Sequence, residues 1–291
     1  MRIGVVILPE TPWARAASNW RLAEDLGLDH AWTYDHLAWR ELRDSPWFGA
    51  VPTLTAAATV TTKIRLGTLV SSANFRHPVP FAKEIITLDD VSSGRLTIGI
   101  GAGTTQWDAS MLGQVPWTLA ERTARFAEFV RLLDELLRSP ETTSRGRFYS
   151  ADEARTYPGC VQAPRVPFAV AASGPKGMRL AAGFGQTWVT AGDGSRERSL
   201  GAEEGAALVR EQCARLDEAC ADVGRDPSSI SRIVVTGGRL SSGMGSAGEF
   251  EETLSRYAEV GMTDLVVHWP RPQDPYKGDL GRFETILANR T

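Results

Sequence analysis

The sequence RLTIGIGAGT, residues 95–104, is an alternating apolar run that ends in three glycines spaced two residues apart. Such alternation is typical of a buried β-strand, and glycines at its end leave the backbone bare, so that a flat ligand can lie against it. The dinucleotide-binding pattern G-x-G-x-x-G does not fit, because its last glycine would fall on Thr104 in one register and on Gln106 in the other. The stretch therefore predicts a strand end that faces a ligand, without naming the ligand.

Eight strand-like runs recur along the chain, and each is followed by a helical pattern. The strands are expected at residues 3–8, 30–34, 64–71, 96–101, 167–172, 187–191, 230–236 and 263–268. The helices are expected at residues 13–26, 53–61, 81–91, 119–137, 176–184, 203–223, 250–260 and 280–288. Thr118 with Glu121, and Ser246 with Glu249, supply helix start signals. Because no linker divides the eight β-then-α units, the pattern predicts a (β/α)8 TIM barrel, a single domain over residues 1–291.

The longest irregular stretches are expected to follow strands. They lie at about residues 37–52, 104–117, 138–166 and 237–246. In a TIM barrel the loops after the strands form the C-terminal mouth, where enzymes of this fold keep their active sites. Tryptophans fall in or beside these loops, where they pack the loops down or line an apolar pocket: Trp39, Trp47, Trp107, Trp117 and Trp269. The pattern therefore predicts loop insertions at the mouth and a site between them.

Composition narrows the class of protein. A chain of 291 residues with 42% hydrophobic and 23% charged residues is typical of a globular protein. The net charge of -3, without a long block of like charge, argues against a nucleic-acid partner. No apolar run reaches the length of a membrane span, and the N-terminal run breaks at Pro9 and Glu10, too early for a signal peptide.

The cysteines and histidines bear on the compartment and on metal binding. Three cysteines, Cys160, Cys213 and Cys220, leave one unpaired under any scheme, so we expect reduced thiols and a cytoplasmic protein without a membrane partner. The four histidines show no metal-ligand spacing and no CxxC motif occurs, so no metal site is expected.

Asp35 and His36 directly follow the second predicted strand, which places them at the mouth. An imidazole titrates near neutrality, so His36 is a candidate acid–base group. Asp35 can fix the tautomer of His36 or bond a ligand itself. The alternative is a structural histidine that caps the strand end through a backbone carbonyl.

The third predicted strand closes with small and hydroxyl residues, GTLVSS at 67–72, which suggests a ligand lying over the strand end. Pro78 then opens a helix at the favoured first-turn position. Arg76 and His77, between the two elements, fit a surface ion pair at least as well as a ligand contact.

The turn from the fifth predicted strand into the next helix predicts an anion site. Amides at a helix N-terminus, glycines that let the backbone approach, and a lysine together suit a phosphate. The candidate contacts are Ser173, Gly174, Pro175, Lys176 and Gly177. The spacing is not that of a Walker loop. A plain helix start explains the proline but not the flanking glycines.

Taken in order along the chain, these segments resemble the bacterial luciferase-like flavin oxidoreductases. The segments are Asp35-His36, Gly67–Val70 with Phe75–Pro78, Leu88–Gly103, Ser173–Gly177 and Tyr257–Leu265. The resemblance covers nearly the whole chain. It implies a (β/α)8 barrel that binds a flavin or the deazaflavin coenzyme F420 at its mouth, and a homodimer. It also implies a non-proline cis peptide after the third strand, which we place at Leu69-Val70 to within one residue.

Within that family the Asp-His pair is similar to the deazaflavin-using members, whereas the luciferases have Glu-His-His. The resemblance implies that His36 lies beside the reacting ring and that Asp35 bonds the cofactor. The further cofactor contacts that we expect are Thr68, Leu69, Val70, Gly101, Ala102, Gly103, Thr104, Thr190 and the residues of the 173–177 turn. Sugar-phosphate dehydrogenases of that group have a glutamate proton donor where this chain has Thr104, which favours another small organic substrate.

The expected function is therefore an F420-dependent oxidoreductase that transfers a hydride between F420 and a small-molecule substrate. An FMN-dependent monooxygenase that uses reduced flavin and oxygen is the runner-up. A flavin-binding protein without turnover is the non-enzyme alternative. His36 and the expected aromatic pocket favour an enzyme.

Overall fold

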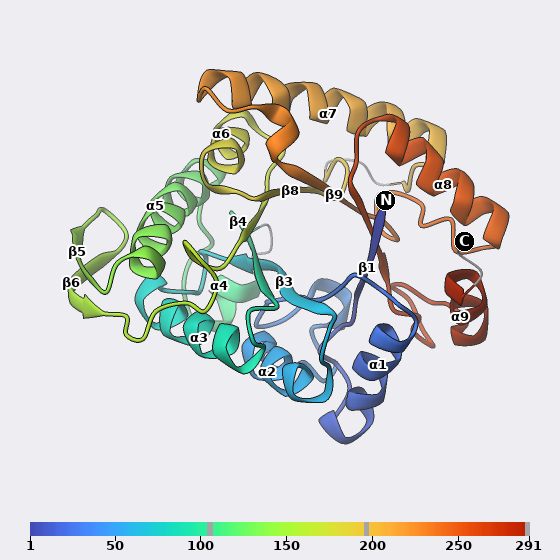
Figure 1. Ribbon diagram of the computed structural model, residues 1–291, viewed down its shortest axis with the longest axis horizontal. Helices are drawn as coiled ribbons and strands as arrows, with labels where there is room; N and C mark the ends of the chain where they lie inside the picture. Colours follow the sequence, from blue (N-terminus) through green and yellow to red (C-terminus); the bar gives the residue numbers. More distant parts are fainter. Residues whose placement is uncertain (104–106, 195–197, 289–291) are drawn as a thin grey trace.

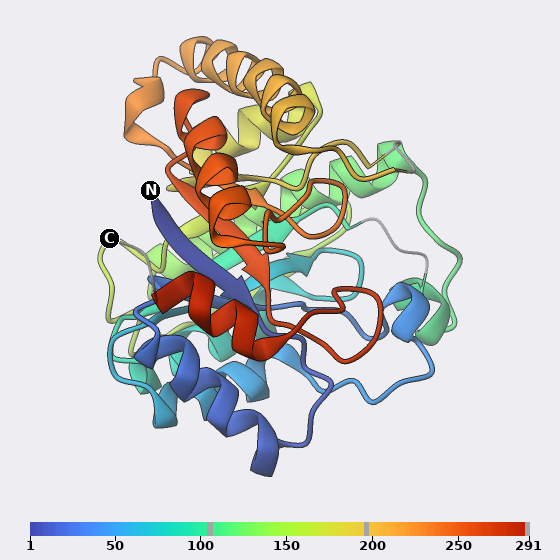
Figure 2. The ribbon, with the colours of Figure 1, turned by 90° about the vertical axis from the view of Figure 1, so that its right-hand side faces the viewer.

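Eight parallel strands close into a barrel. Figures 1 and 2 show the helices arranged around it. The computed structural model describes residues 1–103, 107–194 and 198–288. The barrel order is β1 (Arg2–Val6), β10 (Asp264–His268), β9 (Ser231–Val235), β8 (Thr187–Thr190), β7 (Phe168–Ala171), β4 (Leu96–Gly101), β3 (Arg65–Ser72) and β2 (His30–Thr33). The predicted (β/α)8 TIM barrel is confirmed.

Helices lie between the strands along the chain, and most of them bury apolar side chains in the core around the barrel. They are α1 (Trp13–Asp25), α2 (Ala50–Val60), α3 (Pro78–Val91), α4 (Trp107–Met111), α5 (Leu119–Arg138), α6 (Pro175–Phe184), α7 (Ala202–Asp222), α8 (Ala247–Glu259) and α9 (Leu280–Ala288), with 3-10 turns at Arg40–Leu42 and Pro227–Ser229. The predicted capping box of Thr118 and Glu121 starts α5. All three cysteines are free, as expected. None of the helices in the described ranges is both long and apolar enough to cross a membrane.

The segment 138–166 differs from its prediction as a mouth loop. It follows helix α5, and it forms an antiparallel hairpin of β5 (Glu141–Arg145) and β6 (Ser150–Arg155) beside that helix (Figure 1). Glu128 of α5 accepts hydrogen bonds from the backbone of the hairpin turn, and the Tyr149 hydroxyl donates to the carbonyl of Ala73 at 2.7 Å. Few residues of either strand are buried, so the sequence carries little hydrophobic alternation to reveal the hairpin.

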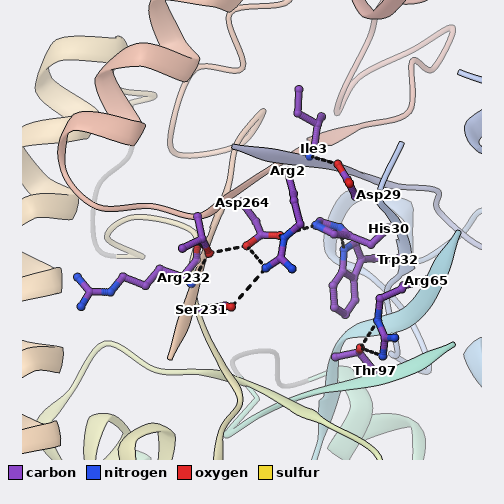
Figure 3. A network of polar contacts seen from close by, with 11 residues as sticks. Arg2, Ile3, Asp29, His30, Trp32, Arg65, Thr97, Ser231, Arg232 and Asp264 are labelled. Carbon is purple, nitrogen blue, oxygen red and sulfur yellow. Dashed lines mark hydrogen bonds and ion pairs between the residues drawn. The ribbon is translucent and has the colours of Figure 1, made fainter. Parts of the chain in front are cut away.

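A buried polar cluster lies at the N-terminal end of the barrel (Figure 3). The indole N–H of Trp32 donates to Nδ1 of His30 at 2.6 Å, so Nε2 of His30 carries the ring proton and faces Oδ1 of Asp264 at 3.0 Å. Two glycines leave room for these rings. A Cβ on Gly4 would lie 1.9 Å from His30, and one on Gly67 would lie 2.4 Å from Trp32.

The carboxylate of Asp264, at the start of β10, contacts residues at the starts of β1 and β2. It pairs with Arg2, whose Nε lies 2.8 Å from Oδ1. Burial alone raises the pKa of Asp264, but hydrogen bonds from His30, Arg2 and Thr263 outweigh it and lower the pKa to about 2. The carboxylate therefore stays ionised and satisfies its buried partners at neutral pH.

A second polar cluster lies at the C-terminal end of the barrel interior. Nδ1 of His268 lies 2.8 Å from the carbonyl oxygen of Thr236, so Nδ1–H donates and Nε2 accepts from the hydroxyl of Tyr34 at 2.6 Å. Tyr276 stacks on the imidazole with ring centroids 3.5 Å apart. Burial lowers the pKa of His268 to about 3, so the ring is neutral at physiological pH.

Replacing Asp264 with alanine should lower the free energy of unfolding by about 3–5 kcal/mol, because buried donors lose their acceptor. Urea unfolding measures this change. Arg2→Ala is the matched control. The Arg2 side chain is half exposed, so its loss should cost about 1 kcal/mol or less. Equal losses in the two variants would contradict this account of the cluster.

Replacing His268 with glutamine should flatten the acid side of the stability profile. The pKa of His268 is depressed in the folded chain, so between about pH 6 and pH 4 the unfolded chain binds one more proton there. Acidification then lowers the free energy of unfolding by roughly 1.4 kcal/mol per pH unit. Urea unfolding over this range should show that slope in the wild type and its loss in His268→Gln. The exposed His77 offers a control, because His77→Gln should retain the slope.

Candidate functional site

Asp35 is buried and forms a bidentate ion pair. Nε of Arg76 lies 2.6 Å from Oδ2, and Nη2 lies 2.8 Å from Oδ1. Arg76 also binds Glu84 at 2.7 Å. The interpretation of Arg76 and His77 as a surface ion pair is therefore wrong. Arg76 neutralises a buried carboxylate, and His77 caps α3 by accepting the N–H of Val79.

His36 pairs with a carboxylate that the sequence did not single out. Nδ1 of His36 lies 2.8 Å from Oδ2 of Asp108, and the N–H of Leu37 donates to Oδ1 at 2.8 Å. Asp108 is fully buried on the short helix α4. The suggestion that Asp35 fixes the tautomer of His36 is thus corrected, because the Asp35 oxygens face Arg76. The only sequence signal for Asp108 was its place in a mouth loop, just after the glycine block.

The expected non-proline cis peptide is present at Leu69-Val70. One extra residue in β3 forms a bulge there against β4. The side chain of Val70 occupies the space beside the β4 glycines, since a Cβ on Gly101 would lie 2.7 Å from it. A Cβ on Gly99 would lie 2.0 Å from the carbonyl oxygen of Thr68. These two glycines therefore make room for β3, and the contact of the Gly101 backbone with a ligand stays a prediction.

The chain beyond β4 is also closely packed. Gly103 has a φ of +72°, and a Cβ there would lie 2.2 Å from the side-chain nitrogen of Asn74. Arg122 of α5 donates to the carbonyl of Gly103 at 2.8 Å. Ala102 is half-buried beside it. The predicted contact Thr104 lies outside the described residues.

The turn at residues 173–177, which we call the anion turn, lies at the neighbouring strand end, because Gly101 of β4 pairs with Ala171 of β7. Ser173 to Lys176 are exposed. Gly174 is the N-cap of α6 without a side-chain cap, and a Cβ on it would meet nothing within 4 Å. The first amides of α6 are thus open to an anion from solvent.

Of the three predicted threonine contacts, the two that lie in the described ranges have hydroxyls with partners within the protein. Thr68 donates to the carbonyl of Gly99 at 2.9 Å, and Thr190 donates to the side chain of Gln212 at 2.6 Å. The hydroxyl of Ser71, by contrast, is buried and has no hydrogen-bond partner among the described residues. It is an additional polar group at the end of β3 that a ligand could satisfy.

Aromatic rings connect the two histidines of the mouth. Trp39 lies with its ring centroid 4.8 Å from that of His36 and 4.8 Å from that of Tyr34, which in turn bonds His268. In the described ranges, no three His, Cys, Asp or Glu side chains are grouped to hold a metal. The mouth therefore combines an imidazole, an aromatic and apolar surface, and an open helix N-terminus, which suits a flat ligand with an anionic tail.

The sequence matches the family model described as luciferase-like monooxygenase over residues 1–242. It is 37% identical over 207 residues to the F420-dependent glucose-6-phosphate dehydrogenase of Beutenbergia cavernae, an alignment covering 69% of this chain and 59% of that protein. It is 33% identical over 178 residues to the 4-hydroxyprotoasukamycin monooxygenase of Streptomyces nodosus subsp. asukaensis, covering 58% and 46%. The matches thus span about half of the length of these curated relatives.

A solved structure shares the whole fold. The F420-dependent secondary alcohol dehydrogenase in complex with an F420-acetone adduct superposes with a TM-score of 0.80 at 18% identity, covering 99% of each chain. At this identity the likeness concerns the fold alone. The family model, by contrast, matches most of the sequence, and the chain belongs to the luciferase-like monooxygenase family.

Proposed function

We propose that this protein is an F420-dependent oxidoreductase that transfers a hydride between F420 and a small organic substrate. The observation that carries the proposal is the 37% identity to a protein named as an F420-dependent dehydrogenase. The Asp35-His36 pair at the end of β2 supports it, because that pair resembles the deazaflavin-using members of the family. The 33% identity to a monooxygenase makes an FMN-dependent oxygenase the second candidate.

The residues of the mouth fit such a cofactor. The anion turn would hold its phosphate through the open amides of α6. Leu69 and Val70 would lie against the ring, together with the backbone of residues 101–103. Both oxygens of Asp35 accept from Arg76, but each keeps a second lone pair for a ring N–H. When bound, F420 supplies a two-electron centre that accepts or donates a hydride.

His36 would move the proton that accompanies the hydride. Its ring lies at the mouth, packed against Trp39, with a side chain that is 9% exposed. A positioned imidazole of this kind can take a proton from a substrate hydroxyl or return it to a carbonyl. The chain has Thr104 where the sugar-phosphate dehydrogenases of that group have a glutamate, which supports a substrate other than a sugar phosphate.

The assembly and location belong to the same proposal. We propose a homodimer in the cytoplasm, as in the family, with no nucleic-acid partner. The net charge of -3 supports the last point. Light scattering after gel filtration measures the assembly directly.

Cofactor choice is the decisive experiment. Purified protein should bind F420 more tightly than FMN in fluorescence titrations, and it should convert alcohols or carbonyl compounds with F420 under anaerobic conditions. Activity that requires reduced FMN and oxygen would establish the second candidate. Tight binding without turnover of any tested substrate would favour a flavin-binding protein.

Replacing Gly174 with leucine should weaken the binding of F420 by about tenfold or more, because the side chain would cover the amides that hold the phosphate. The backbone tolerates the change, since a Cβ there meets nothing within 4 Å. Gly183, at the other end of α6, is equally open and is the control. Gly183→Leu should retain wild-type affinity. Unchanged affinity in a folded Gly174→Leu protein would remove the anion turn from the site.

Replacing His36 with alanine should leave the F420 dissociation constant nearly unchanged and lower turnover by about two to four orders of magnitude. His77→Ala, at an exposed histidine, is the matched control and should stay close to wild type. A structural role predicts the reverse pattern for His36→Ala: a lower melting temperature with near-normal turnover of the folded fraction.

A further inference from the structure

We propose that Asp108 is the positioning residue that fixes the tautomer of His36, so that Nε2 is the nitrogen that exchanges a proton with the substrate. The part of the proposal that concerns the tautomer depends only on the geometry of the mouth. The part that concerns proton exchange rests on the proposed function.

The bond between the two side chains determines which nitrogen carries the proton. An ionised carboxylate only accepts hydrogen bonds, so the Nδ1 that lies 2.8 Å from Oδ2 of Asp108 must be protonated. That distance is typical of a bond to a charged acceptor. In the neutral ring the lone pair is then on Nε2, at the opposite edge. The described residues give Nε2 no hydrogen-bond partner.

The carboxylate itself is held in place. Asp108 is fully buried, and its second oxygen accepts the N–H of Leu37 at 2.8 Å. The guanidinium carbon of Arg43 lies 4.5 Å from the ring centroid of Trp107, the residue before Asp108. This contact holds α4 against the loop after β2. Because both oxygens have assigned donors, the carboxylate cannot rotate without breaking one bond.

The imidazole is held from its other sides as well. Trp39 packs against the ring with the two planes 35° apart, and the indole N–H of Trp47 donates to the carbonyl of His36 at 2.8 Å. Packing and hydrogen bonds therefore keep one edge of the ring toward Asp108, which leaves the Nε2 edge for a substrate.

This arrangement suits a substrate that bears a hydroxyl on the reacting carbon. In the direction of oxidation the O–H bond breaks and an N–H bond forms on Nε2, while the hydride leaves the same carbon for the cofactor of the proposed function. The product is a carbonyl compound. The positive charge that the ring gains lies beside the carboxylate of Asp108, which stabilises it without taking the proton.

Asp108→Asn tests the assignment with little change of shape. The amide oxygen can still accept from Leu37, but the amide NH2 would then face Nδ1 and donate to it, so the ring proton moves to Nε2. Nitrogen-15 spectra of histidine-labelled protein, recorded where the imidazole is neutral, report which ring nitrogen is protonated. We expect protonated Nδ1 in the wild type and protonated Nε2 in the variant. We also expect turnover to fall by about two to four orders of magnitude.

Two control variants distinguish a role of Asp108 in orienting His36 from a role in holding α4 against the loop after β2. Arg43→Ala removes the other tie of α4 and should leave the tautomer unchanged, with turnover within a fewfold of wild type. Asp44→Asn, at an exposed carboxylate in the same loop, should change neither. If Arg43→Ala lowers turnover as much as Asp108→Asn, the role of Asp108 is to hold the loops.

The outcomes also distinguish this proposal from the proposed function. An unchanged His36 tautomer in folded Asp108→Asn overturns the proposal whatever cofactor the protein uses. A changed tautomer with wild-type turnover overturns the assignment of Nε2 as the proton-exchanging nitrogen. If the tautomer changes as expected but the wild type does not use F420, the proposed function and the role of Nε2 in proton exchange are both overturned. Asp108 then remains the residue that orients the ring.

Discussion

The close approach of β3 and β4 is the constraint on which the mouth depends. Without side chains on Gly99 and Gly101, the bulge of β3 at Leu69 and Val70 fits against the β4 backbone. This places Val70 over the end of β4 and lets the chain continue to Gly103, whose carbonyl is bound by Arg122. Any side chain at either glycine would push the strands apart, and the loops that carry the polar groups would lose their common support.

Charge at the mouth is arranged in two separate pairs. Asp35 and His36 are neighbours in sequence, yet Asp35 pairs with Arg76 from the loop after β3, and His36 pairs with Asp108 from the loop after β4. Adjacent residues of a strand end point in different directions, so a single β2 terminus supplies both a fixed anion and an imidazole. Each buried charge has its own partner, as burial requires.

The sequence was sufficient for the fold because its signals are local. Strand alternation, helical periodicity and the capping residue Thr118 depend on near neighbours, and the barrel follows from their order. The hairpin of β5 and β6 was missed because its strands are mostly polar and owe their place to contacts with Glu128. Its position after α5 shows that the length of a loop does not by itself place it at the mouth.

The site was harder to predict because its geometry depends on distant parts of the chain. The positions of His36 and of the 173–177 turn followed from the strand order, whereas Asp108 is 72 residues from His36, and the two meet because the loops after β2 and β4 lie at the same end of the barrel. The periodicity of the sequence does not indicate which carboxylate forms a hydrogen bond with which histidine. The glycines of β4 illustrate the same limit, since a missing side chain can make room for a ligand or for another strand, and only the packed structure distinguishes the two. Strand β4 and the loop after it therefore contribute to the mouth in two ways: the glycines of β4 make room for β3, and Asp108 of the loop contacts His36.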